Sequence, residues 1–129
     1  MPRDGRNRTG RLGERIAAQR LERLGYTLIE RNHRSREGEI DLIATRRGVL
    51  VFCEVKTLVR RGRSDHDGPA FPLEAVGPLK RAQVRRLARG WLAARPHAAR
   101  WRSIRLDAIG VSLSADGDVL AIDHVENAF

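Results

Sequence analysis

The stretch of sequence that decides the fold spans residues 38–56 and reads GEIDLIATRRGVLVFCEVK. It contains two runs rich in apolar and β-branched residues, 39–45 and 49–56, on either side of an Arg-Arg-Gly turn at 46–48. Runs of this kind around a short glycine-containing turn predict two antiparallel strands. We therefore expect a β-hairpin at this point of the chain.

Two acids of the first strand and a Glu-Val-Lys triplet of the second lie at spacings that can bring them together. Because side chains alternate along a strand, Glu39 and Asp41 lie on one face of the first strand, and Glu54 and Lys56 lie on one face of the second. A two-residue turn sets Asp41 opposite Glu54 and Glu39 opposite Lys56. A three-residue loop instead sets Asp41 opposite Cys53. The sequence is compatible with both registers.

Upstream of the hairpin, apolar residues recur at helical spacing between positions 12 and 24. Thr9 can cap the start of this helix, and Gly25 can adopt the left-handed conformation that ends one. Glu14 borders the buried stripe of the helix. It is either a solvated glutamate favoured by the helix dipole or a functional acid.

The rest of the chain predicts a single domain over residues 1–129, as its length indicates. Further elements follow from periodicity and turn residues. They are a flexible basic tail at 1–8, a strand at 26–31, a polar loop at 32–38, a mobile basic loop at 58–72, a helix at 74–94, and strands at 102–111 and 119–126. The expected order is α-β-β-β-α-β-β, which is an α/β arrangement.

The helix at 74–94 separates an apolar arc from a row of arginines. Lys80 falls within the apolar arc, so we expect its ammonium to point toward the sheet. The arc consists of Leu79, Val84, Leu87 and Trp91, and the outward row consists of Arg81, Arg85 and Arg89.

Positive charge dominates the composition. The formal net charge is +9, which favours a polyanionic partner such as nucleic acid, although a basic surface without a specific partner is the alternative. Of the 25 basic residues, 23 are arginine, and only Lys56 and Lys80 are lysine. A lysine offers a compact ammonium whose pKa can shift, which suits a catalytic site.

Other classes of protein are not expected. Cys53 is the single cysteine, which rules out an internal disulfide and a cysteine-based zinc site. The four histidines are scattered without ligand spacing, so no zinc site is predicted. Residues 1–11 lack the apolar core of a signal peptide, and no apolar run approaches the ~18 residues of a membrane span. A cytoplasmic location without membrane contact is the expectation.

The hairpin acids have a chemical use together. Mg²⁺ and Mn²⁺ prefer oxygen ligands, which Asp41 and Glu54 can supply. A bound cation stabilises charge on a phosphate and activates water, and Lys56 can orient that water or neutralise the transition state. The alternative is that the Glu-Val-Lys triplet is an exposed ion pair worth about 0 to 1 kcal/mol.

At these residues the sequence resembles the restriction-endonuclease-like, or PD-(D/E)XK, nuclease superfamily, which has an acid on one strand and Glu-x-Lys on the next. A closer resemblance, to the YraN-like family of bacterial proteins, spans nearly the whole chain. It rests on Gly13-Glu14, Gly25-Tyr26, Arg31-Asn32, residues 38–43, residues 52–57, Glu74-Ala75-Val76 and Glu126-Asn127-Ala128-Phe129.

The YraN-like family is similar to archaeal Holliday-junction resolvases. The resemblance implies a restriction-endonuclease-like fold, with a mixed sheet flanked by helices, and a metal-dependent endonuclease that acts on branched or structured DNA, with a homodimer by analogy. It further implies that Asp41 and Glu54 are metal ligands, Lys56 is the catalytic lysine and Glu14 is an auxiliary acid. Lys80 and Gln83 lie where related nucleases place a supporting residue.

Contacts with nucleic acid are expected from the basic loop and from the second helix. A protein that keeps the nuclease fold but only binds nucleic acid is the main alternative, and a structural or partner-binding protein is a third. The expected nucleic-acid contacts are Arg60, Arg61, Arg63, Lys80, Arg81, Gln83 and Arg85.

Overall fold

The computed structural model describes residues 2–61, 77–95 and 101–129. Its helices and strands follow one another in the predicted order α-β-β-β-α-β-β. They are α1 (Pro2–Arg23), β1 (Thr27–Ser35), β2 (Gly38–Arg46), β3 (Val49–Arg60), α2 (Pro78–Ala93), β4 (Ser103–Ser114) and β5 (Val119–Val125).

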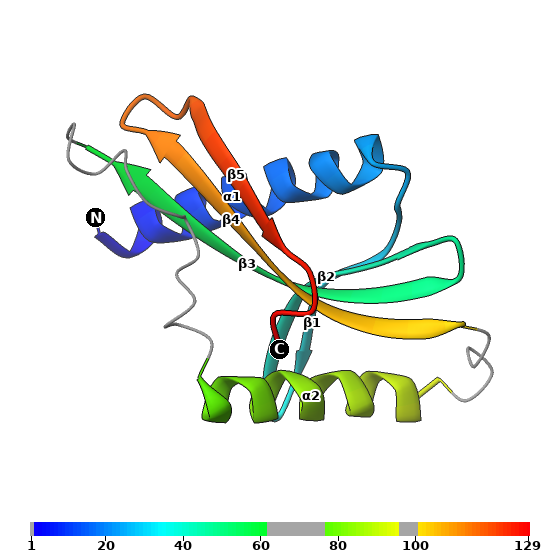
Figure 1. Cartoon of the computed structure of the whole chain (residues 1–129). Coiled ribbons are helices and arrows are strands. Elements are labelled where there is room, and N and C mark those ends of the chain that lie inside the picture. The colour runs from blue at the N-terminus through cyan, green and yellow to red at the C-terminus, as the bar shows by residue number, and fades with distance from the viewer. Residues whose placement is uncertain (1, 62–76, 96–100) are drawn as a thin grey trace.

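The five strands form one sheet in the order β1-β2-β3-β4-β5. Strands β3 and β4 are parallel, and every other neighbouring pair is antiparallel. Parallel neighbours need a crossover connection, and α2 lies within it. The two helices cover opposite faces of the sheet (Figure 1). A mixed sheet with flanking helices is the architecture that the restriction-endonuclease-like resemblance implies, and it is confirmed.

Each face of the sheet buries its own apolar core. On one face, Ala17 and Leu21 of α1 pack against strand residues such as Val51. On the other, Trp91 of α2 meets Phe52 edge-to-face with ring centroids 5.5 Å apart. Such burial is the main favourable term in folding, so the two cores hold the helices on the sheet.

The apolar arc of α2 is confirmed except at its first residue. Val84, Leu87 and Trp91 are buried, whereas Leu79 is 89% exposed. Leu79 follows Pro78 in the first turn of α2, which extends beyond the apolar surface of the sheet.

The predicted two-residue turn between β2 and β3 is confirmed. Arg46 pairs with Val49, and the register continues to Leu42 opposite Cys53. Arg47 and Gly48 both have positive φ, 51° and 79°, as a tight hairpin turn of this twist requires. The alternative three-residue loop is therefore wrong.

The polar loop expected at 32–38 is instead the end of one strand and the start of the next. β1 continues to Ser35, and a turn at Arg36 and Glu37 leads directly into β2 at Gly38. β1 is an edge strand in the described part of the chain. Its polar side chains can therefore face solvent without loss of strand structure.

Two other boundaries differ from the expectation. α1 begins at Pro2, so residues 2–8, expected as a tail, continue the helix; proline is favourable in a first turn because its missing N–H has no partner there. β3 extends to Arg60 rather than ending at Lys56, because β4 pairs with it along its full length. The remainder of the loop expected at 58–72 lies outside the described residues, apart from Arg61.

Neither helix in the described part of the chain is long and apolar enough to cross a membrane.

Candidate functional site

Three carboxylates from two elements converge beside the sheet. Glu14 of α1 and Glu39 and Asp41 of β2 each place one oxygen within 4.8 Å of the others. We call these three residues the acid cluster. Asp41 and Glu14 were predicted site residues, whereas Glu39 was expected beside Asp41 and opposite Lys56 but was not predicted as a ligand.

A glycine lets α1 approach the sheet closely enough to deliver Glu14. A Cβ built on Gly13 would lie 1.8 Å from Oγ1 of Thr57 on β3, so the position has no room for a side chain. The close contact between helix and strand sets the next residue, Glu14, beside the acids of β2.

Asn32 holds two members of the acid cluster together. It adopts a positive φ of 52°, which asparagine tolerates better than most residues. With its amide nitrogen turned toward the acids, it donates to Oε1 of Glu39 at 2.8 Å and to Oε2 of Glu14 at 2.9 Å. One neutral amide thus bridges two carboxylates without supplying positive charge.

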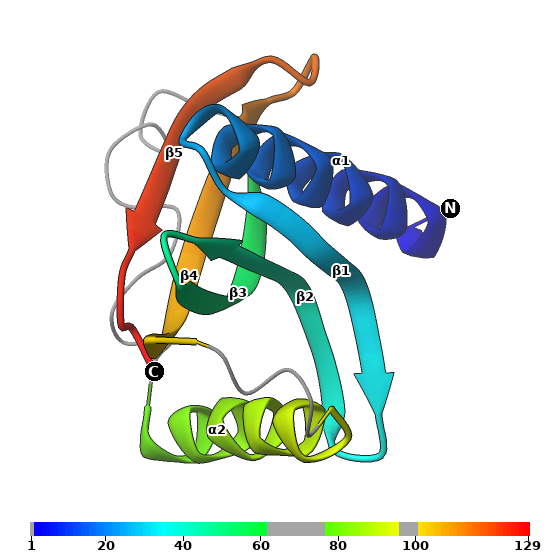
Figure 2. The same cartoon turned by 90° about the vertical axis from the view of Figure 1, so that its right-hand side faces the viewer.

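Asp41 lies where β2 and β3 separate. The last pair between these strands is Leu42 with Cys53, and beyond it the backbone N–H of Val55 donates to Oδ2 of Asp41 at 2.7 Å. Figure 2 shows β1 and β2 curving away from β3 toward α2. The carboxylate therefore takes the place of a main-chain acceptor at the fork of the sheet.

The electrostatics of the acid cluster are unfavourable to negative charge. Burial is the largest cause that raises the pKa of Asp41, from 3.8 to about 7, and the charges of Glu14, Glu54 and Glu39 raise it further against the Val55 hydrogen bond. Burial, followed by the charge of Glu39, also raises the pKa of Glu14. An added cation would relieve both effects.

Glu54, the second predicted metal ligand, turns toward α2. Its Oε1 lies 2.6 Å from Nζ of Lys80, which confirms that this lysine points toward the sheet. Its Oε2 is buried and has no hydrogen-bond partner among the described residues. The structure therefore brings Asp41, but not Glu54, into the group within 4.8 Å.

Glu54 and the acid cluster are nevertheless neighbours. Glu39 and Glu54 line the same narrow hollow, of about 10 Å³, together with residues of α2 such as Val84. That volume is close to the space one water molecule needs. Lys56 follows two residues after Glu54 on β3 and is exposed.

The predicted nucleic-acid contacts differ in their surroundings. Arg81 and Arg85 are exposed, as is Arg89, so the row faces outward as predicted. Gln83 donates from Nε2 to the carbonyl oxygen of Glu37 at 3.1 Å, which ties α2 to the tip of the β1–β2 hairpin. Lys80 is paired with Glu54, as described above. The remaining three lie shortly after Lys56: Arg60 donates to Ser112 at 3.4 Å, Arg61 is exposed, and Arg63 is outside the described residues.

A second buried acid escaped the sequence-based prediction. Asp107 on β4 is fully buried and accepts hydrogen bonds from Arg105 at 2.9 Å, His124 at 2.7 Å and the backbone of Asn127 at 3.0 Å. Burial opposes ionisation, but the bonds from His124 and Arg105 outweigh it and lower the pKa of Asp107. An aspartate inside the apolar run 106–111 was the signal for such a centre.

The uncharacterised protein family UPF0102 matches residues 13–111, which contain the acid cluster, Glu54 and Lys56. The chain belongs to this family. Membership of UPF0102 agrees with the resemblance to the YraN-like family and covers most of the described structure.

The alignments with similar UPF0102 proteins cover most of the chain. One from Frankia casuarinae is 42% identical over 120 residues, which are 93% of this chain and 94% of the relative. One from Kineococcus radiotolerans is 45% identical over 116 residues, 90% and 88% of the two chains. One from Clavibacter michiganensis subsp. michiganensis is 50% identical over 102 residues, 79% and 80% of the two chains.

Proposed function

We propose that this UPF0102 protein is a metal-dependent endonuclease that hydrolyses phosphodiester bonds in DNA, with Mg²⁺ or Mn²⁺ as cofactor. The observation on which the proposal depends is the acid cluster, in which Glu14, Glu39 and Asp41 place oxygens within 4.8 Å. The net charge of +9 makes a polyanionic substrate the natural counterpart of such a site.

The side chains present fit a hard divalent cation. Oxygens bound to one Mg²⁺ at about 2.1 Å lie up to about 4.2 Å apart, so small rotations within the acid cluster would suffice. The raised pKa of Asp41 and the buried, unpartnered Oε2 of Glu54 are what a cation between these groups would correct. Glu14, Glu39 and Asp41 would hold the ion, with Glu54 as a further donor.

A divalent cation at this place would polarise the phosphodiester and lower the pKa of an attacking water. Other residues of the chain would supply the remaining requirements of the reaction. Asn32 orients Glu14 and Glu39, and the Val55 N–H fixes the carboxylate of Asp41. The exposed ammonium of Lys56 neutralises charge that develops on the phosphate, and the outward arginines of α2 bind the DNA backbone.

Branched or structured DNA is the substrate that the family resemblance favours. Exposed Arg81 and Arg85 on α2 can bind a phosphate backbone without reading base edges. A homodimer would present two such sites, as cleavage of two strands of a junction requires.

The test is cleavage of branched and linear DNA in Mg²⁺ or Mn²⁺. We expect Asp41→Asn to lower the rate by about a hundredfold or more, as loss of one strong electrostatic contact in a transition state does. Lys56→Arg is also expected to be slower, since guanidinium is bulkier and keeps its proton. Glu22→Gln, on the exposed side of α1, is the matched control. Equal rates in all four proteins would refute the proposal.

A second candidate is a nucleic-acid-binding protein without turnover. The ion pair between Glu54 and Lys80, at 2.6 Å, favours it, because a lysine then neutralises one predicted metal ligand. The two functions differ in their need for metal. Calorimetric titration with Mn²⁺ separates them: a nuclease binds the ion and loses it in Asp41→Asn, whereas the binding protein shows salt-dependent DNA affinity with no metal requirement.

A further inference from the structure

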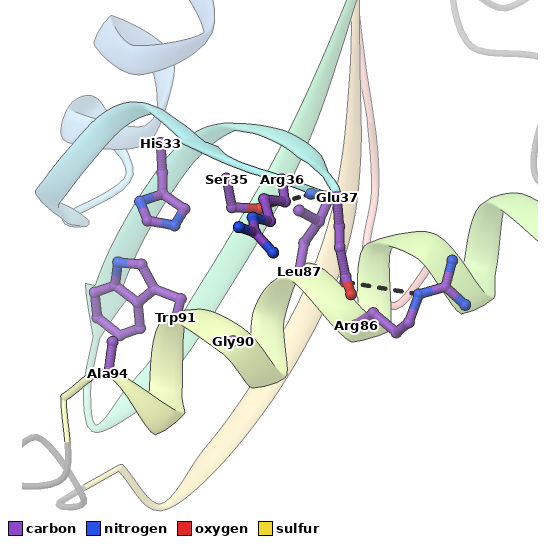
Figure 3. A pocket seen from close by; sticks show the side chains of 9 residues that line it. All are labelled: His33, Ser35, Arg36, Glu37, Arg86, Leu87, Gly90, Trp91 and Ala94. Atoms are coloured by element: carbon purple, nitrogen blue, oxygen red, sulfur yellow. Dashed lines mark hydrogen bonds and ion pairs between the residues drawn. The ribbon is translucent and has the colours of Figure 1, made fainter.

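A hollow of about 430 Å³ lies between the tip of the β1–β2 hairpin and α2 (Figure 3). The hairpin contributes His33, Ser35 and Arg36 to its lining, and the helix contributes Leu87, Gly90 and Trp91. We call it the hairpin hollow. Its volume falls in the range of sites that bind small molecules or parts of larger ones.

The hairpin hollow combines a basic rim with an apolar floor. Arg36 reaches over it from the hairpin turn, and Arg86 lies at the side, where it is ion-paired with Glu37 at 3.6 Å (Figure 3). The floor is the helix surface at Leu87 and Gly90. A ligand with an anionic group and a flat, weakly polar body matches this pattern, and a nucleotide has both.

Glu30 orients two ring side chains that line the hairpin hollow, those of Trp91 and His33. Glu30 accepts a hydrogen bond from Nε1 of Trp91 at 3.0 Å, and its other oxygen lies 2.8 Å from Nδ1 of His33. This arrangement leaves Nε2 of His33 available for a ligand. Because one carboxylate orients both rings, the wall is formed before anything binds.

Gly90 is the most informative residue of the floor. It lies inside α2, where glycine weakens a helix, yet a Cβ built on it would meet nothing within 4 Å. Packing within the described residues therefore does not explain why a side chain is absent. Close approach of a ligand to the helix backbone does explain it, since glycine permits such approach.

The hairpin hollow and the acid cluster are neighbours on the same hairpin. His33 lines the hollow, and the preceding residue, Asn32, bonds to Glu14 and Glu39. Two consecutive residues of β1 therefore belong to the two sites, so the hairpin connects them directly.

We propose that the hairpin hollow binds one unpaired nucleotide of the DNA while an adjacent phosphodiester lies at the acid cluster. The inference rests on the proposed nuclease function and narrows its substrate to DNA with an unpaired nucleotide. Arg36 takes the phosphate of that nucleotide, and the base lies over Gly90.

The experiment compares two fluorescein-labelled duplexes, one with a single unpaired nucleotide and one fully paired, by fluorescence anisotropy in EDTA. The wild-type chain is expected to bind the first about tenfold more tightly, because only that duplex can place a base in the hairpin hollow. Arg36→Gln and Gly90→Leu should remove this preference. Arg20→Gln, an equal change of charge at an exposed position of α1, should keep it. Equal affinity of the wild type for both duplexes, or an undiminished preference in Gly90→Leu, would overturn the inference.

Two further measurements distinguish loss of the nucleotide site in Gly90→Leu from misfolding of this variant and from loss of the proposed metal site. The midpoint of thermal unfolding of Gly90→Leu should be no lower than that of the wild type, because leucine is a better helix former than glycine. Its affinity for Mn²⁺ should be unchanged. A lost preference accompanied by lost Mn²⁺ binding would count against a separate site. A wild-type chain that binds no Mn²⁺ but prefers the unpaired nucleotide would refute the nuclease and retain the nucleotide site.

Discussion

Asp41 and Asp107 are acids of the same sheet, yet their surroundings shift the pKa of the two carboxyl groups in opposite directions. Asp107 is fully buried, but bonds from His124 and Arg105 lower its pKa. Asp41 is only partly buried, and its pKa is raised to about 7 because burial is accompanied by three other carboxylates. Partners, more than depth, decide which of the two is stably charged.

The difference separates a structural centre from a candidate functional one. The charge of Asp107 is compensated within the chain, by Arg105 and by His124 when that ring is protonated. In the acid cluster, two ionisable side chains that lie within 4.8 Å of the Asp41 carboxylate, Glu14 and Glu39, are themselves acids. A group of neighbouring carboxylates does not stabilise the fold, because like charges repel one another. Binding of a cation between them would make their ionised state favourable.

The largest expected effect on stability is at Asp107, whose charge is compensated within the chain. Asp107→Asn should lower the free energy of unfolding by about 3 kcal/mol, because Arg105 and His124 would lose their buried counter-charge. Urea denaturation measures this change, with Asp118→Asn at an exposed position as the control. A loss below about 1 kcal/mol would mean that Asp107 is no more structural than a surface acid.

The next effect concerns how the acid cluster is assembled. Gly13→Ala should cost about 2 kcal/mol of unfolding free energy, since its Cβ would overlap Oγ1 of Thr57, and should weaken Mn²⁺ binding by displacing Glu14. The double variant with Thr57→Ala should recover only part of both losses, because the Cβ that remains at position 57 lies 2.8 Å from the added Cβ. Gly10→Ala, where a Cβ meets nothing within 4 Å, is the matched control. Unchanged Mn²⁺ affinity in Gly13→Ala would separate Glu14 from the metal site.

A pH titration of stability contrasts the two aspartates directly. The pKa of Asp41 is higher in the folded chain, about 7, than its ordinary 3.8, so the folded state holds the extra proton between these values. Stability of the metal-free protein should therefore fall as pH rises through this window. Asp107, whose pKa is lowered, should instead lose its contribution as pH falls below 3.8.

Asp41→Asn makes the same contrast measurable at one pH. At pH 8 it should raise the free energy of unfolding by about 1 to 2 kcal/mol while it abolishes Mn²⁺ binding, because the amide keeps an acceptor for Val55 without the charge. Chemical denaturation at pH 5 and pH 8 tests this prediction. Destabilisation at pH 8, as expected for Asp107→Asn, would remove the distinction between the two acids.

The smallest expected effect is at Lys80. Lys80→Gln should change stability by less than about 1 kcal/mol, since its ion pair with Glu54 is partly exposed. It should raise Mn²⁺ affinity by about threefold, because Glu54 would no longer have a competing cation. Calorimetry of this variant checks the role of Glu54: weaker Mn²⁺ binding would show that Lys80 supports the site instead of competing for it.

Local patterns predicted much of this site. The Arg47-Gly48 turn predicted the register between β2 and β3, and helical periodicity predicted that Lys80 points inward; both are confirmed. The two-residue turn also predicted that Asp41 pairs with Glu54 across the two strands. The paired residues instead end at Leu42 with Cys53, because the carboxylate of Asp41 takes the Val55 N–H where the strands separate.

Residues close together in the chain were enough to predict the order of the elements and the presence of acids near the middle of the sheet, whereas they left two registers open for the turn. Which acids meet depends on contacts between distant residues. Glu14 reaches the cluster because Gly13 packs on Thr57, and Asp107 is held by a hydrogen bond from His124 of another strand. Such contacts join residues far apart in the chain, and burial and charge there depend on how strands curve and helices approach.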